Sequence, residues 1–260
     1  METLEGRQSV SAALQARQRK IQVILIRQGS RPERIQDVVT LAEQCGVPLR
    51  YVPREELDAL THGASHGGIA AVCSPKPRMA ATDLIDMVRR MREPPLLLLL
   101  EGVDDVRNLG FTLRSAEALG AHAVLIKKHL WDFDPGDLAR SSSGAYERLP
   151  LVQIEDLAPL RELQAVGVRI YGCLAKARRT LYDVPLQEPA LLAIGGEKRG
   201  LSGAVRSICD QLISIPGRGE PTSLSLSHAA ALVLAEAMRQ RGAFGKLALK
   251  QPPSDAADGT

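Results

Sequence analysis

Residues 96–120 read LLLLLEGVDDVRNLGFTLRSAEALG, and this stretch decides the fold class. It opens with five leucines, a run far shorter than the roughly 20 apolar residues that a bilayer span requires. A short apolar run between Pro94-Pro95 and Gly102 is typical of a strand buried on both faces of a parallel sheet. A polar turn follows, and we expect a helix over 109–119 with Asn108 as its N-cap. A buried strand leading directly into a helix is the repeating unit of an α/β sheet.

The same alternation of strand and helix continues towards the C-terminus. Further strands are expected at 123–127, 169–173, 191–194 and 212–215. The helices expected between and after them cover 137–142, 156–166, 201–209 and 226–241. This order predicts an α/β domain with a doubly wound parallel sheet over residues 94–244. The polar tail at 245–260, which contains Pro252-Pro253, is expected to be disordered.

A second, smaller unit is predicted on the N-terminal side of the leucine run. Strands are expected at 23–26, 49–52 and 69–72, with helices at 7–16, 32–46 and 54–60. They predict a small α/β domain over residues 1–75. Residues 76–93 form the predicted linker, because prolines interrupt regular structure at 74–78 and a single amphipathic helix, at 82–92, precedes Pro94.

Composition narrows the class of protein. Hydrophobic residues make up 45% of the chain, enough for a packed core, and aromatic residues make up 3%, too few for extensive base stacking. The net charge of +3 does not identify a nucleic-acid binder, and basic runs such as Arg17–Lys20 are interpreted as solvent-exposed. The four cysteines form no CxxC pair, so neither a metal site nor a disulfide is expected. With no signal peptide and no membrane span in the sequence, we expect a cytoplasmic protein.

Candidate functional residues lie where three of the predicted strands end, the edge at which parallel sheets bind ligands. After the leucine strand, Asn108 and Arg114 are six residues apart and are expected on one helix face. The planar guanidinium of Arg114 suits a phosphate, and a surface salt bridge is the alternative. After the strand at 191–194, residues 195–200 read GGEKRG. These glycines either let a ligand approach the backbone or form only a tight turn.

The third segment follows the strand at 212–215 and is rich in proline, glycine and serine. One of Ser223, Ser225 and Ser227 is expected to cap the long helix, and the others are candidates for hydrogen bonds to a ligand. His228 has no second histidine at metal-ligand spacing. It is therefore interpreted as a packing or capping residue and not as a catalytic base.

Taken together, the three segments resemble the signature motifs of the SpoU/TrmH family of RNA ribose 2′-O-methyltransferases, in the same order and at similar spacing. The residues that carry the resemblance are Asn108, Gly110, Arg114, Ala116 and Gly120 in the first motif, Gly195, Glu197, Gly200 and Leu201 in the second, and Ile215, Pro216, Gly219, Ser223, Leu224, Ser227 and Ala229 in the third. Residues 6–71 resemble the small RNA substrate-binding domain of members that modify ribosomal RNA. The resemblance covers nearly the whole chain except its tail.

The resemblance implies a fold, a cofactor and partners. Members of this SPOUT class carry a C-terminal trefoil knot that holds a bent S-adenosylmethionine. They act on RNA and are usually homodimers whose active site uses both subunits. Carried over by position, the cofactor contacts fall on Gly195, Ile215 and Leu224, largely through backbone groups.

Catalytic roles are implied as well. Because an arginine stays protonated in proteins, a phosphate clamp beside the developing alkoxide is favoured for Arg114 over the family's proposed role as proton acceptor. Asn108 and Glu197 would orient Arg114 and the adjoining loops, and Ser223 would hold the knot loop or the ribose. Ser225 stands where the family usually has asparagine, and its hydroxyl is expected to replace the missing carboxamide.

Two functions are therefore compared. The first is an enzyme that transfers a methyl group from S-adenosylmethionine to a ribose 2′-hydroxyl in RNA, with ribosomal RNA preferred over transfer RNA. The alternative is a non-catalytic RNA-binding ribosome-assembly factor with the same fold, which Ser225 favours and the intact Asn108, Arg114 and Glu197 oppose. A small-molecule methyltransferase is a poorer third interpretation, because the N-terminal domain suits a large substrate.

Overall fold

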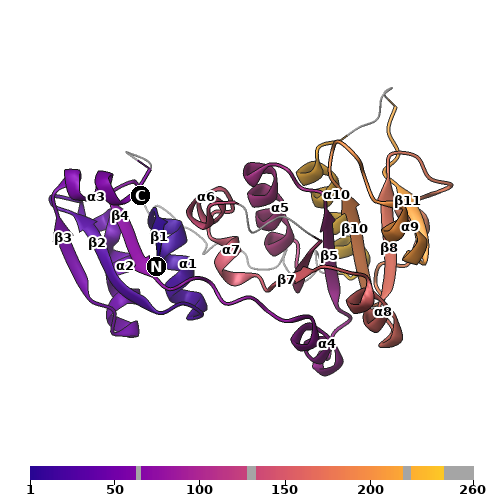
Figure 1. Ribbon diagram of the computed structural model, residues 1–260, viewed down its shortest axis with the longest axis horizontal. Coiled ribbons are helices and arrows are strands. Elements are labelled where there is room, and N and C mark those ends of the chain that lie inside the picture. Colours follow the sequence, from indigo (N-terminus) through magenta and orange to yellow (C-terminus); the bar gives the residue numbers. More distant parts are fainter. Residues whose placement is uncertain (63–65, 128–132, 219–223, 243–260) are drawn as a thin grey trace, which may run out of the picture.

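The computed structural model describes residues 1–62, 66–127, 133–218 and 224–242. The chain forms two α/β units that lie side by side along the long axis, connected by a segment that runs through α4 (Ala81–Arg90) (Figure 1). Within the described ranges, no helix combines the length and the hydropathy that crossing a bilayer demands. The tail at 245–260, for which disorder was expected, lies outside these ranges.

The N-terminal unit contains a four-stranded mixed sheet in the order β1-β4-β2-β3. Its elements are β1 (Glu2–Glu5), α1 (Arg7–Ala16), β2 (Ile21–Arg27), α2 (Pro32–Cys45), β3 (Leu49–Val52), α3 (Arg54–Leu60) and β4 (Ile69–Cys73). β2 and β3 are parallel, whereas β4 runs antiparallel to both β1 and β2. The predicted strands and helices are confirmed, and β1 is an addition. Its sequence ETLE has too few apolar residues to predict a strand.

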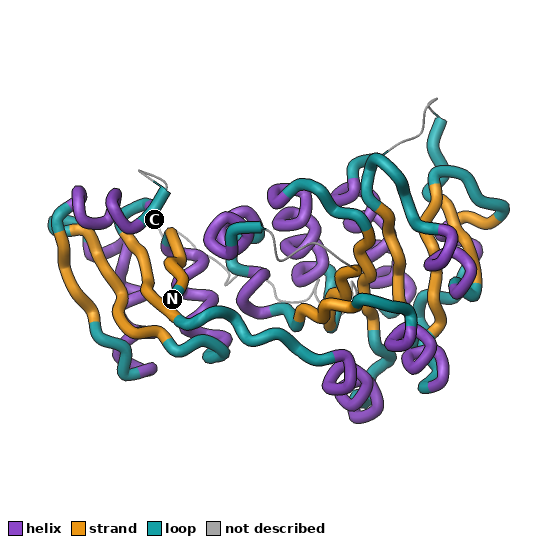
Figure 2. Tube along the Cα trace, in the orientation of Figure 1, coloured by secondary structure: helices purple, strands orange, loops and turns teal. Residues whose placement is uncertain are grey.

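The second unit is built on a seven-stranded sheet in the order β7-β6-β5-β10-β8-β11-β9, with every adjacent pair parallel. In Figure 2 the strands of this unit, in orange, stand between purple helices on either side. Its strands are β5 (Leu96–Glu101), β6 (Ala123–Lys127), β7 (Leu151–Ile154), β8 (Arg169–Leu174), β9 (Arg179–Thr180), β10 (Ala190–Gly195) and β11 (Gln211–Ser214). The predicted parallel sheet and its expected strands are confirmed to within one residue at each end. The short edge strands β7 and β9 were not expected, because so few residues give no periodic signal.

Helices cover both faces of this sheet. The elements are α5 (Val106–Ala118), α6 (Pro135–Ser141), α7 (Ala145–Arg148) and α10 (Leu226–Gln240) on one face, and α4, α8 (Ala158–Ala165) and α9 (Gly203–Ile208) on the other, with a 3₁₀ turn at Leu181–Asp183. Leu96, Leu98 and Leu100 pack in the first of these cores, and Leu97 and Leu99 pack in the second. All five leucines are at most 1% exposed, as expected for a strand buried on both faces.

Strand order places the ligand-binding edge of the sheet. The chain moves outward from β5 to β6 and β7, then crosses over to β8, and β10 later pairs between β5 and β8. Where neighbouring strands connect in opposite directions, their carboxyl ends leave a crevice. In this protein that crevice lies beyond Glu101, Leu174 and Gly195.

The two units are in direct contact as well as linked by the chain. β1 and α1 of the small unit pack on α6 and α7 of the large one, and one apolar core runs through both, including Leu4, Val10, Leu138 and Tyr146. Gly144, the N-cap of α7, has φ of +85°, and a Cβ there would lie 2.6 Å from the Cβ of Ala12. The α1 and α7 backbones therefore approach as closely as a residue without a side chain allows.

Candidate active site

A cavity of about 780 Å³ opens at the carboxyl edge of the large sheet. Its walls come from the ends of β8 and β10, from the segment after β11 and from the start of α10. Gly195, Ile215 and Leu224, the residues predicted to contact a cofactor, all line it although they belong to different segments of the chain. The volume lies in the range that suits a cofactor of nucleoside size.

Backbone packing shapes one wall of this cavity. A Cβ on Gly195 would lie 2.0 Å from the carbonyl carbon of Gly200, and a Cβ on Gly196 would lie 1.9 Å from the carbonyl oxygen of Gly102. The Gly196 N–H donates to the Glu101 carbonyl at 2.7 Å, and the Gly200 N–H donates to the Gly196 carbonyl at 2.8 Å. The turn after β10 is therefore closed without side chains, and its backbone is left next to the cavity.

A second, smaller cavity of about 310 Å³ adjoins the first and shares Gly196, Glu197 and Leu226 with it. Asn108 also lines it, and its Nδ2 donates to Glu197 Oε1 at 3.1 Å. The same carboxylate oxygen accepts the backbone N–H of Leu226 at 3.4 Å. The Glu197 side chain thus joins the three motif segments at the boundary between the two cavities.

The prediction that Asn108 caps its helix is wrong. Helix α5 starts at Val106, and the N-cap is Asp105, whose Oδ1 accepts the N–H groups of Arg107 at 2.7 Å and Asn108 at 2.9 Å. Aspartate and asparagine are about equally good caps, so composition did not distinguish them. The earlier start leaves the Asn108 carboxamide available to Glu197.

The expectation that Asn108 and Arg114 share a helix face is also wrong. Both lie inside the regular helix α5, where six residues at about 100° each rotate the direction of the side chain by about 240°. Arg114 is exposed and lines neither of the two cavities, whereas Asn108 lines the smaller one. Within one described chain, the site therefore brings together Asn108 and Glu197 but not Arg114.

Ser225 is the serine that caps α10, as expected for one of the three candidates. Its Oγ accepts the His228 N–H at 3.5 Å, lies 2.5 Å from His228 Nδ1 and lies 3.2 Å from Ser227 Oγ. His228 is therefore the residue whose backbone N–H is capped, and its ring packs beside the cap through the contact with Ser225. Ser225 also lines the larger cavity, and Ser223 falls outside the described residues.

Sequence reasoning missed Glu101, the last residue of β5. Its carboxylate accepts Lys127 Nζ at 2.8 Å and the Ser202 N–H at 2.7 Å. Partial burial raises the pKa of this carboxyl, but the hydrogen bonds from Lys127 and Ser202 outweigh burial and bring the pKa below its usual value. Its position directly after the leucine run could have indicated it, since functional groups are often found at the carboxyl ends of parallel strands.

The comparisons with known proteins agree with this geometry. Residues 95–235 match the SpoU rRNA Methylase family, and residues 3–79 match the family described as RNA 2′-O ribose methyltransferase substrate binding. The chain is 40% identical over 219 residues to the 23S rRNA (guanosine-2′-O-)-methyltransferase RlmB of Xylella fastidiosa, covering 84% of this chain and 88% of that protein. It is 35% identical over 241 residues to the Escherichia coli K12 protein of the same name, covering 92% and 99%.

Solved structures give the same result. The SpoU methyltransferase AviRb from Streptomyces viridochromogenes, in complex with AdoMet, superimposes with a TM-score of 0.76 and 27% identity over 93% of this chain and 90% of that one. A crystal structure described as an RNA 2′-O ribose methyltransferase gives 0.75 and 27% over 92% and 88%. By its motifs, its fold and the match over residues 95–235, the chain belongs to the SpoU rRNA methylase family.

Proposed function

We propose that this protein transfers a methyl group from S-adenosylmethionine to a ribose 2′-hydroxyl of ribosomal RNA. The observation that carries the proposal is the Asn108–Glu197 contact, which stands between a glycine-walled cavity of cofactor size and a smaller polar one. The RlmB relatives, whose names state 23S rRNA guanosine 2′-O-methylation, support both the reaction and the RNA.

The larger cavity fits the cofactor in its chemistry as well as its size. Ile215, Leu224 and Leu226 offer apolar side chains for an adenine ring, and the turn at Gly195-Gly196 offers backbone groups with no Cβ in the way. When bound, S-adenosylmethionine supplies an electrophilic methyl group on a sulfonium. We propose that the segments around this cavity form the trefoil knot of the class.

The smaller cavity receives the ribose of the target nucleotide. It shares Glu197 with the cofactor cavity, so a ribose oxygen placed there lies next to the methyl group, and positioning supplies most of the rate enhancement. Glu197 holds the Asn108 carboxamide and the Leu226 N–H, which keeps α5, the glycine turn and α10 in register during transfer. Bound in the larger cavity, S-adenosylmethionine would supply the methyl group that replaces the proton of the 2′-hydroxyl, and that proton would pass to solvent or an RNA phosphate.

Arg114 acts in the cavity of a partner subunit in a homodimer. Its exposure on α5, away from both cavities of its own chain, supports this arrangement. There its guanidinium clamps the phosphate beside the target ribose and stabilises the developing alkoxide.

Residues 1–75 bind the RNA beside the target. In Figure 1, α3 of the small unit and the start of α10 lie on the same, upper side of the molecule. The carboxyl ends of β2 and β3 therefore face the same way as the two cavities. Arg27 ends β2, Arg31 and Arg34 follow it, and all three are exposed, which suits an extended RNA backbone.

Single-turnover methylation of ribosomal RNA by wild type and Arg114→Ala tests this function. We expect transfer to fall at least about a hundredfold with unchanged affinity for S-adenosylmethionine, because the arginine contacts RNA and not the cofactor. Arg161→Ala, which removes an exposed arginine from α8 on the opposite face of the sheet, is the matched control and should retain full activity. Undiminished transfer by Arg114→Ala would refute the mechanism. Mass-spectrometric mapping of the RNA identifies the nucleotide that is methylated.

Mixing two inactive variants tests the role of the partner subunit. Arg114→Ala keeps its cofactor cavity, and a Gly195 variant that cannot bind cofactor keeps its arginine. A mixed dimer contains one complete site if Arg114 acts across the interface, so activity returns on mixing. No recovery from verified mixed dimers would place Arg114 in its own chain's site.

The non-catalytic RNA-binding alternative rests on Ser225, which replaces the family's asparagine. Cofactor binding without methyl transfer by the wild type would favour it. The intact Asn108–Glu197 contact supports the enzyme.

A further inference from the structure

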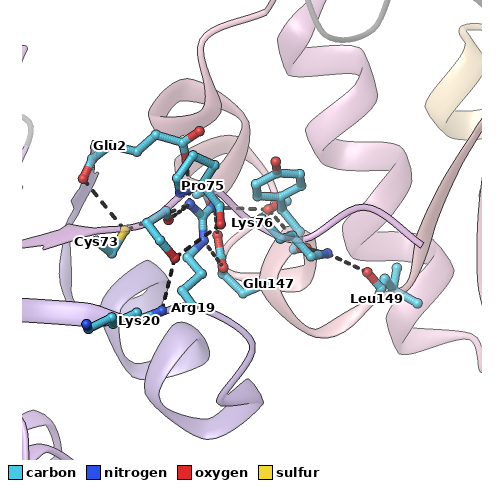
Figure 3. Close-up of polar contacts among 12 residues, drawn as sticks. Glu2, Arg19, Lys20, Cys73, Pro75, Lys76, Glu147 and Leu149 are labelled. Carbon is cyan, nitrogen blue, oxygen red and sulfur yellow. Dashed lines mark hydrogen bonds and ion pairs between the residues drawn. The ribbon is translucent and has the colours of Figure 1, made fainter. Parts of the chain in front are cut away.

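A cluster of charged side chains is buried where the two units meet, and we call it the interdomain joint (Figure 3). It consists of Glu2, Arg19 and Lys76 from the N-terminal part of the chain and Tyr146 and Glu147 from α7. Arg19 Nε donates to Glu147 Oε2 at 2.7 Å and Nη2 donates to Oε1 at 2.9 Å, a bidentate pair. The side chain of Arg19 is 0% exposed and that of Glu147 is 1% exposed.

Arg19 Nη1 and Lys76 Nζ make further hydrogen bonds in the joint. Arg19 Nη1 donates to the Ser74 carbonyl at 2.9 Å and pairs with Glu2. Lys76 Nζ donates to the Leu149 carbonyl at 2.6 Å and to the Tyr146 carbonyl, and it lies 4.8 Å from the centre of the Tyr146 ring. Arg19 thus pairs with two carboxylates, Glu147 fully buried and Glu2 partly exposed, while Lys76 is held by two backbone carbonyls.

Such a joint fixes geometry more than it adds stability. Removing two charges from water costs nearly as much as their attraction returns, so a buried pair is weak evidence of stabilisation. A bidentate guanidinium–carboxylate pair, however, is satisfied in only one relative orientation. Because Arg19 and Glu147 belong to different units, that orientation is the orientation of the small unit on the large one.

Close packing connects the joint to the active site. Residue Gly144, at the start of α7, lies against Ala12 of α1, and α6 lies against α5 with no room for a side chain between them. A Cβ on Gly110 would lie 2.0 Å from Ser141 Oγ, and that hydroxyl donates to the Val106 carbonyl at 3.3 Å. Helix α5 carries both Asn108 and Arg114. The small unit therefore rests on α6 and α7, and these helices pack against α5, which presents the catalytic motif.

We propose that the Arg19–Glu147 pair is a positioning device that determines which ribose of a long RNA reaches the smaller cavity. The distance from the small unit to the cavities determines which nucleotide of a bound RNA reaches them. The Arg19–Glu147 pair holds that distance constant. This proposal rests on the methyl-transfer function above. It assigns to Arg19 and Glu147 a role in site selection that acts through the orientation of the RNA-binding unit, without contact with RNA or cofactor.

The test replaces the pair by apolar side chains, Arg19→Met together with Glu147→Leu. This double variant removes one charge of each sign, Glu2 remains partly exposed, and Lys76 keeps its two carbonyl acceptors, so the protein is expected to fold. The matched control is Arg169→Met with Glu188→Leu, which removes an exposed pair with an N···O distance of 3.5 Å inside the large unit. Single-turnover rates are measured on ribosomal RNA and on a short oligoribonucleotide that carries only the target nucleotide and its neighbours.

We expect the joint variant to lose at least about tenfold in kcat/KM on ribosomal RNA, equivalent to about 1.4 kcal/mol, with methyl groups appearing at neighbouring riboses. Its rate on the short RNA and its affinity for S-adenosylmethionine should match the control. Equal losses on both RNAs would reduce the pair to a structural role and overturn the proposal. So would unchanged site selection on ribosomal RNA.

A second measurement does not depend on activity. Spin labels introduced through unnatural amino acids at the exposed positions 51 and 161, one in each unit, report the distance between the units. We expect one narrow distance distribution in wild type and control and a broad one in the joint variant. A narrow distribution in all three would overturn the proposal. If the wild type methylates no RNA, the proposed function fails, and these distances still decide whether the pair fixes the orientation.

Discussion

The cofactor cavity and the interdomain joint are built in opposite ways. The cavity is closed by backbone at Gly195 and Gly196, where any side chain would overlap a neighbouring peptide. The joint is made of long charged side chains that reach across from Arg19 and Lys76 to α7 and the residue after it. A site made of backbone follows directly from strand order, whereas a site made of distant side chains exists only after the two units have docked. The cavity should therefore be disrupted by substitutions that add atoms, and the joint by changes of charge.

The largest effect is expected from Gly195→Ala. One methyl group there would lie 2.0 Å from the Gly200 carbonyl carbon, so the turn must move and the cavity wall moves with it. We expect affinity for S-adenosylmethionine to fall at least about a hundredfold, about 2.7 kcal/mol by calorimetry. Gly203→Ala is the control, because a Cβ at that position meets nothing within 4 Å. Normal binding by Gly195→Ala would place the cofactor elsewhere.

A smaller effect, specific to the joint, is expected from pH. Burial lowers the pKa of Lys76 to about 8 against an ordinary value of 10.5, with Glu147 opposing this shift. Above pH 8 the folded protein loses a proton that the unfolded chain keeps, so the free energy of unfolding rises with pH. We expect this group to contribute about 1 kcal/mol over the first pH unit above its folded pKa.

Denaturant titrations of wild type and Lys76→Met measure that contribution. The difference between the two proteins removes the opposing contributions of Cys73 and Tyr146, whose pKa values burial raises to about 11 and about 12. Parallel pH dependences for the two proteins would mean that Lys76 carries no shifted pKa in the joint.

The smallest effects are expected at Ser225, where a side chain serves the cavity. Ser225→Ala removes the cap of α10 and should cost about 1 kcal/mol of stability. The same variant should slow methyl transfer by no more than about tenfold, because the backbone wall stays in place. Ser225→Asn keeps a capping side chain and should match or slightly exceed the wild type in both thermal unfolding and single-turnover rate. A hundredfold loss in Ser225→Asn would show that the hydroxyl itself is needed.

The sequence predicted most of what depends on local pattern. The strands of the large sheet were found because apolar runs such as Leu96–Leu100 end at polar turns, and Gly195, Ile215 and Leu224 were placed in one cavity by the family motifs. The helix start at Val106 was missed because Asp105 and Asn108 are equally suitable caps. Asn108 and Arg114 were expected on one helix face because six residues are nearly two turns. At 3.6 residues per turn, however, the remainder leaves the two side chains pointing in different directions.

The joint was not predictable in this way. Arg19 belongs to a basic run interpreted as solvent-exposed, yet its side chain is fully buried. Nothing near residue 19 in the sequence indicates Glu147, which is 128 residues away, because the two residues pair only when the two units of the chain dock. A charged residue in a sequence gives no indication that it is buried until the surface that covers it is known.

The position of β10 in the large sheet has a consequence for synthesis. β10 lies between β5 and β8, so Leu96 pairs with Ala190 across all of the chain that forms β6 to β9. A nascent chain that has emerged only as far as β9 lacks the strand that joins β5 to β8. Unpaired edges of this kind are prone to pair with other chains. The time that a ribosome takes to synthesise the chain from β5 to β10 is therefore the interval during which this protein most needs protection from aggregation.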